Sequence, residues 1–185
     1  MRTALAASCQ GSALGQNQTS ALSTGVTLLA PATVKQGADF QVELTADPIV
    51  VPTTGGGYSI ARLSAVSIRF NLPAGATFKS ATLSGGSLLG SGVPSVASSG
   101  GLITLTVPGN LSPGTTAILP KVTATLNASG AVGTSLPAQL HGTSYSDPGI
   151  SFTATVSGVP LFGNLDVPTK CFASPNPVLG TTTIN

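Results

Sequence analysis

The chain has 185 residues, a formal net charge of +2 and a mean hydropathy of +0.40, and 41% of its residues are hydrophobic. Only 6% are Asp, Glu, Lys or Arg, and there is one His and no Trp. Catalysis, metal binding and nucleic-acid recognition draw on these residue types, and the absence of a basic cluster predicts no nucleic-acid partner. The length fits one domain, and the hydrophobic fraction argues against disorder. No apolar run approaches the ~20 residues that a membrane-spanning helix needs.

The chain begins with a segment that shows no clear strand pattern. Residues 10–25 are small and polar without periodicity, so we expect residues 1–25 to form an extended N-terminal arm. Residues 1–8 are too few for a complete signal peptide. We therefore expect an export signal to have been removed or to lie upstream.

Five segments beyond residue 25 alternate apolar and polar residues with a period of two. They are residues 40–45, 66–70, 103–107, 122–126 and 150–156. This period predicts half-buried antiparallel strands with one face in water. In the second segment, for example, Val66, Ile68 and Phe70 are expected to point inward. No segment shows a comparable helical period.

Turn signals separate the strand-like segments at intervals of about 10 to 15 residues. Pro and Gly occur together in residues 72–75, 111–114 and 146–149, where a chain reversal needs their backbone preferences. Pro120, Pro137 and Pro160 indicate edge strands or bulges. About nine or ten candidate strands predict an immunoglobulin-like antiparallel β-sandwich over residues 26–171. The tail, residues 172–185, could add an edge strand.

Two cysteines, Cys9 and Cys171, lie near opposite ends of the chain. A composition typical of extracellular proteins favours a disulfide between them, and two free buried thiols are the alternative. Closing so long a loop would stabilise the fold by up to about 5 kcal/mol. Ala6 stands where a lipid-attachment motif needs a Leu-like residue, which argues against a lipid-anchored Cys9. Two distant cysteines and one His do not predict a zinc site, and we expect no metal and no cofactor.

Two resemblances add to this interpretation. Residues 66–126 resemble the immunoglobulin-like repeat modules of bacterial surface proteins, through the segments LPAGATF (72–78), SAT (80–82), LTVPGNLSPGT (105–115) and VTATL (122–126). Four further segments are similar to a family of secreted envelope proteins from mycolic-acid-bearing actinobacteria: TADPIVVPT (45–53), ATLSGGS (81–87), GTSYSDPG (142–149) and CFASPNPVL (171–179). The resemblance implies an exported β-protein with one disulfide, extracellular or in the cell envelope. It implies no catalytic residues.

The one imidazole, His141, lies close in sequence to Ser144, Ser146 and Asp147. These are the ingredients of a Ser-His-Asp triad, but neither a strained GxSxG turn nor an oxyanion hole is evident. A structural His at the end of a strand is the competing interpretation. We therefore expect no enzymatic activity, and a hydrolase around His141 remains a remote alternative.

Three pairs of threonines alternate with apolar residues in the predicted strands. They are Thr104 and Thr106, Thr123 and Thr125, and Thr153 and Thr155. If their strands were adjacent, the hydroxyls would form a flat, uncharged face suited to self-assembly. Ordinary β-propensity on a solvent face explains the same pattern.

The leading hypothesis is a non-enzymatic, exported surface protein that acts by self-assembly or adhesion, with another copy or another envelope component as partner. A largely uncharged surface favours such association. The alternative is a carrier of an apolar, lipid-like ligand between two sheets. Phe70, Phe78, Phe152 and Phe162 could line that space.

Overall fold

A computed structural model describes residues 1–185, and all of its regular secondary structure is β. The strands are β1 (Arg2–Ala13), β2 (Gln16–Leu29), β3 (Thr33–Val34), β4 (Asp39–Ala46), β5 (Ile49–Val50), β6 (Thr54–Gly55), β7 (Tyr58–Asn71), β8 (Ala76–Ser84), β9 (Ser95–Ser99), β10 (Leu102–Leu111), β11 (Thr116–Ala117), β12 (Lys121–Ala128), β13 (Ser135–Gln139), β14 (Ile150–Val159), β15 (Gly163–Ala173) and β16 (Val178–Ile184). The all-β, antiparallel sandwich with one disulfide is confirmed. Its strands outnumber the expected nine or ten because several two-residue strands and the N-terminal segment also pair.

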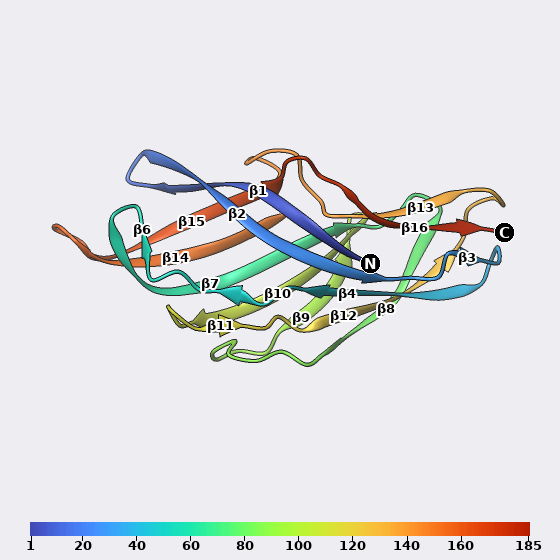
Figure 1. Ribbon diagram of the computed structural model, residues 1–185, viewed down its shortest axis with the longest axis horizontal. Helices are drawn as coiled ribbons and strands as arrows, with labels where there is room; N and C mark the ends of the chain where they lie inside the picture. The colour runs from blue at the N-terminus through green and yellow to red at the C-terminus, as the bar shows by residue number, and fades with distance from the viewer.

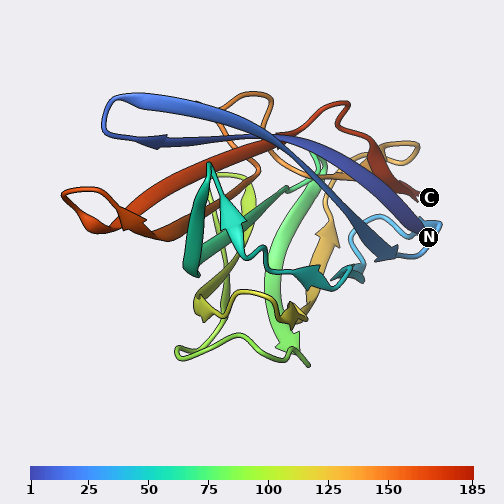
Figure 2. The ribbon, with the colours of Figure 1, turned by 60° about the vertical axis from the view of Figure 1, so that its left-hand side comes forward.

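Eleven strands belong to one large sheet (Figure 1). Ten of them follow the order β8-β12-β4-β2-β1-β15-β14-β7-β10-β9, and β6 pairs with β7 beside this path. The sheet rolls over so that its two end strands, β8 and β9, contact each other. Two layers therefore face each other, and Figure 2 shows them crossing at an angle.

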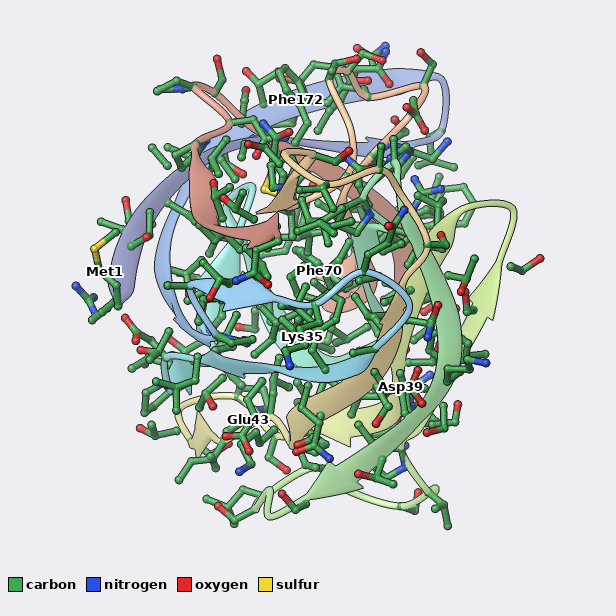
Figure 3. The ribbon with its side chains drawn as sticks, turned by 90° about the vertical axis from the view of Figure 1, so that its right-hand side faces the viewer. Met1, Lys35, Asp39, Glu43, Phe70 and Phe172 are labelled. Carbon is green, nitrogen blue, oxygen red and sulfur yellow. A yellow bond between two sulfur atoms is a disulfide. The ribbon has the colours of Figure 1, made fainter.

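The inward positions of the alternating segments form the core. The residues expected to point inward in β4, β7, β10 and β12 are all buried: Phe40, Val42, Leu44, Val66, Ile68, Phe70, Ile103, Leu105, Val107, Val122, Ala124 and Leu126. Figure 3 shows Phe70 near the centre of the ring of strands, with Asp39 and Glu43 at its periphery. A local period of two thus becomes an apolar interior once the sheet closes on itself.

The N-terminal segment is not a separate arm. β1 and β2 form a hairpin within the sheet, and β1 pairs with β15 while β2 pairs with β4. Leu5, Ala7 and Cys9 are buried on the inner side of β1. The expected arm, residues 1–25, is therefore corrected to two strands of the sandwich. The polar residues of this segment do not alternate with apolar ones, because backbone hydrogen bonds rather than a buried apolar face hold it in the sheet.

The C-terminal tail also belongs to the fold. β16 is the central strand of a second sheet, in the order β13-β16-β3, rather than an edge strand. Leu179 and Ile184 are buried, and the Thr182 hydroxyl donates a 2.7 Å hydrogen bond to the Pro31 carbonyl. This sheet caps one end of the sandwich, at the right of Figure 1.

Cys9 and Cys171 form a disulfide between directly paired residues of β1 and β15. Their Cα atoms are 4.0 Å apart, and both side chains are buried. The bond joins positions 162 residues apart in the sequence. It fixes the first strand of the chain to one of the last, in the middle of the sheet.

Candidate functional site

An open cavity of about 810 Å³ extends from the middle of the sandwich to the end opposite the three-stranded cap. Phe70 and Leu140 lie at its inner end, and residues of the β1–β2 hairpin turn lie at its mouth. Its volume falls in the range of roughly 300–1,000 Å³ that is usual for ligand pockets. Hydrophobic residues make up 28 of the 42 that line it, and none of the 42 carries a charge. Such a lining selects for apolar ligands.

The floor of the cavity is the inner face of three neighbouring strands. β7, β14 and β15 contribute Ile60, Leu63, Val66, Ile68, Ile150, Phe152, Ala154, Val156, Leu165 and Val167. Phe152, Leu165 and Val167 pack against the core but are only partly buried. Apolar area left uncovered costs about 25 cal/mol per Å² relative to burial. A bound apolar chain would recover that free energy.

The next two strands of the sheet, β1 and β2, line the cavity partly with small side chains. β1 contributes Gly11 and Ala13, and β2 contributes Ser20, Ala21 and Ser23. A chain with 4% aromatic residues and no Trp has few side chains large enough to fill the space between the layers. Protein cores otherwise pack to the density of organic crystals. At the capped end, by contrast, the core contains a void of about 30 Å³.

One edge of the cavity is polar without being charged. Gln16, Gln18 and Thr24 of β2 provide amides and a hydroxyl along this edge. Tyr58 adds its phenol where β7 begins. The arrangement suits a ligand with an apolar chain and an uncharged polar group, since each amide and hydroxyl can donate or accept hydrogen bonds.

The four phenylalanines proposed from the sequence are divided by the fold. Phe70 and Phe152 line the cavity. Phe78 packs against the core from the end strand β8, and Phe162 lies in the β14–β15 turn with 54% of its surface exposed. Most of the lining is aliphatic, and sequence reasoning missed it. The alternations over residues 66–70 and 150–156 were the signals that pointed to the floor.

The three threonine pairs do not form one face. β10 and β14 lie on opposite sides of β7, and β12 lies between β8 and β4. Thr155 is buried and donates a 2.6 Å hydrogen bond to Asp166. The condition for a continuous threonine face, adjacent strands, is therefore not met. A shorter hydroxyl row does cross β14, β7 and β10 through Ser151, Ser67 and Thr106.

His141 and its sequence neighbours come together, but not as a catalytic triad. Nδ1 of His141 lies 2.7 Å from Oδ1 of Asn71, and Nε2 lies 2.8 Å from Oδ1 of Asp147. The Ser144 hydroxyl contacts Ser146 and accepts a hydrogen bond from the Asp147 amide. A triad needs a nucleophile's hydroxyl on one ring nitrogen and a carboxylate on the other. Here an amide and a carboxylate occupy both nitrogens.

This network fixes the loop of residues 141–149 to β7. The His141 amide donates to the Arg69 carbonyl at 2.8 Å, and the Arg69 guanidinium donates to the Pro148 carbonyl. Arg69 also lies 3.7 Å from Asp147. The same loop contacts β1, where the Ser8 and Tyr145 hydroxyls are 2.6 Å apart. The geometry accounts for His141 as a structural residue.

The ion pairs of the structure also lie outside the cavity lining. Arg2 pairs with Asp47 at 2.5 Å, and Lys121 pairs with Glu43 at 3.0 Å. The hydrogen bond to Asp47, together with its negative charge, raises the pKa of Arg2 above its ordinary value. The structure holds no group of three His, Cys, Asp or Glu side chains arranged to bind a metal ion. The cavity therefore offers apolar surface and neutral hydrogen-bonding groups.

Comparison with known proteins supports the fold. No protein-family model matches the sequence, and no curated protein matches it. Among solved structures, the fold is similar to a "putative membrane anchored protein" from Corynebacterium diphtheriae, with a TM-score of 0.66 and 18% sequence identity. The similarity covers 100% of this chain and 38% of the other, so this chain spans well under half of that protein's length. The structure contains no helix that could cross a membrane.

Proposed function

We propose that this chain is a non-enzymatic, exported surface protein that binds an apolar, lipid-like ligand in its open cavity. One observation carries the proposal: about 810 Å³ of space lined by 42 residues, none of them charged. A filled sandwich core would leave no such space. The ligand would lie along Phe152, Leu165 and Val167, with any polar group toward the amides of β2.

The free energy of burial is sufficient for useful affinity. Burying one methylene contributes about 0.8 kcal/mol, so a chain of about ten methylenes would gain roughly 8 kcal/mol before the costs of ordering. Since association costs roughly 4 kcal/mol or more, an affinity near micromolar requires a chain of about fifteen methylenes or longer. The absence of charge in the lining means that no ion has to lose its water when the ligand enters.

The location at the cell surface rests on three supports. The Cys9–Cys171 disulfide is typical of proteins that fold in an oxidising compartment. The similar structure from Corynebacterium diphtheriae is described as a "putative membrane anchored protein", and the sequence resembles secreted envelope proteins of mycolic-acid-bearing actinobacteria. We extend a cell-envelope or extracellular location to this chain on those grounds. Self-assembly was the leading hypothesis from the sequence, but the continuous threonine face proposed for it does not form, because the three strands are not adjacent.

The test compares two substitutions at neighbouring positions of β14. Ala154 lines the cavity, whereas Thr153 points to the outer face of the same strand. We expect Ala154→Phe to fill the cavity and weaken binding of the fluorescent probe N-phenyl-1-naphthylamine by about tenfold or more. Thr153→Phe should leave probe affinity unchanged. Circular dichroism checks that both variants fold.

The same experiment contains the results that would overturn the proposal. Equal probe affinity in the parent and Ala154→Phe would show that the cavity is not the binding site. No probe binding by the parent would count equally against it. Native mass spectrometry and light scattering of the purified protein add a second measurement. Extended particles without co-purifying lipid would favour self-assembly instead.

A further inference from the structure

Two hairpin turns at the open end of the cavity expose large apolar side chains to water. Leu14 lies at the tip of the β1–β2 turn and is 59% exposed. Leu161 and Phe162 lie in the β14–β15 turn and are 101% and 54% exposed. Figures 1 and 2 both place these two turns at the same end of the molecule, away from the N- and C-termini. We call Leu14, Leu161 and Phe162 the apolar tips.

The apolar tips continue the surface of the cavity. Leu14 is itself a lining residue, and Val159 and Leu165, on either side of the second turn, line the cavity as well. Val50 also lines the cavity, and its side chain is largely exposed. Apolar surface therefore runs from the cavity floor through the mouth to the ends of both hairpins.

The backbone shows that folding alone does not favour leucine at the tips. Leu14 and Leu161 have φ values of +51° and +72°, in the left-handed region that strains most side chains. Leu14 and Gly15 form the two-residue turn between β1 and β2, where Asn-Gly is the preferred pair. An Asn at either leucine would relieve strain and remove apolar surface from water. Leucine at these two positions is therefore unfavourable both for the backbone conformation and for exposure to water.

The segments around the tips carry no charge. Residues 12–18, 48–60 and 156–165 contain no Asp, Glu, Lys or Arg. Their polar members are neutral amides and hydroxyls, such as Asn17 beside the first turn and Asn164 beside the second. Insertion into lipid would therefore desolvate no ion, and the amides would lie at the level of the headgroups. A charged protein partner would find nothing complementary here.

We propose that the apolar tips insert into a lipid surface and place the mouth of the cavity against it. Two separate protruding turns suit a yielding lipid layer better than the flat, closely packed surface of a protein partner. The proposal of docking is supported by the apolar tips alone and does not depend on the proposed function. Only the further step, in which an apolar chain passes between the lipid surface and the cavity, rests on the proposed function.

The test measures flotation of the protein with phosphatidylcholine vesicles. The variant combines Leu14→Asn, Leu161→Asn and Phe162→Ser. We expect the parent to float with the vesicles and the triple variant to lose binding by about tenfold or more. Its melting temperature should not fall, because Asn tolerates the left-handed backbone better than Leu. Added salt should not release the parent, because no charge takes part.

The chain offers a matched control in Leu88. This leucine is also 60% exposed with a positive φ of +57°, but it lies in the β8–β9 loop, away from both tips. Leu88→Asn should bind vesicles as the parent does. The inference is overturned if the parent does not bind, if the triple variant binds equally well, or if Leu88→Asn weakens binding as much. It is also overturned if the triple substitution converts a dimer to a monomer, since a second copy would then cover the tips.

Docking and ligand binding can fail independently. Ala154→Phe should lose the fluorescent probe and still float with vesicles, because it leaves the tips intact. The double variant Leu161→Asn and Phe162→Ser, which changes no lining residue, should keep the probe and lose most of its vesicle binding. A parent that binds vesicles but no probe would contradict the proposed function and leave docking supported. A parent that binds the probe but no vesicles would contradict docking and leave the proposed function supported.

Discussion

At the scale of the residue, two glycines decide how the loop of residues 141–149 closes on itself. Gly142 has a φ of +93°, and a Cβ added there would collide with the backbone of Gly149 and Asp147. A Cβ added at Gly149 would collide with the His141 carbonyl. The close backbone contact lets His141 reach Asp147 and Asn71 with its two ring nitrogens. Hydrogen bonding in this loop thus depends on residues without side chains.

We expect Gly142→Ala to lower the free energy of unfolding by about 2 kcal/mol or more, because steric collision adds to backbone strain. Urea denaturation measures the loss. Gly133→Ala is the control, since Gly133 has a φ of +88° but open space around it. It should cost about 1 kcal/mol from the backbone alone. Equal losses in the two variants would contradict the close packing of the loop.

The His141 side chain provides a second test at this scale. We expect His141→Ala to destabilise the fold by about 1–2 kcal/mol, because Asn71 loses a partner inside a partly buried network. Probe binding should not change, since His141 does not line the cavity. Thermal melting and probe titration measure the two effects. Lost probe binding in a folded variant would contradict a purely structural role.

At the scale of the element, the pairing of β1 with β15 brings the two ends of the chain together. The disulfide reinforces that pairing from inside, with both sulfur-bearing side chains buried. We expect the double variant Cys9→Ala and Cys171→Ala to lose about 2–5 kcal/mol of stability. Denaturant titration of the variant against the parent measures this, and reductant should destabilise the parent alone. Unchanged stability would mean that strand pairing suffices without the bond.

At the scale of the whole molecule, the sandwich is asymmetric. One end is covered by the sheet of β13, β16 and β3, and the other end opens into the cavity between the two hairpin turns. A ligand that binds only the folded state stabilises it in proportion to its saturation. We expect an apolar probe at 100 times its Kd to stabilise the parent by about 2.7 kcal/mol and Ala154→Phe much less. Differential scanning calorimetry measures the shift, and equal shifts would place the probe elsewhere.

The sequence by itself determined which face of β4, β7, β10 and β12 is buried, whereas in β14 Thr155, expected on the outer face, is buried. Phe40, Val66 and Ile103 could be assigned inward from a period of two, because that period is a local property of extended backbone. The low charge also follows from composition alone, and it appears again in the cavity lining. Of the four phenylalanines that the sequence suggested for a ligand cavity, only Phe70 and Phe152 line it.

Only the tertiary structure decided which strands are neighbours, and the cavity, the cap and the apolar tips follow from that. The N-terminal hairpin entered the sheet through backbone hydrogen bonds to β4 and β15, which no side-chain period records. Phe162 does not line the cavity as expected, because it lies in an exposed turn. The threonine pairs do not form one face, because β7 lies between β10 and β14. Strand order depends on pairing between positions as much as 166 residues apart, Ala7 and Ala173. Local patterns cannot encode such contacts, because every outward face made of Thr and Ser looks alike until its partner is known.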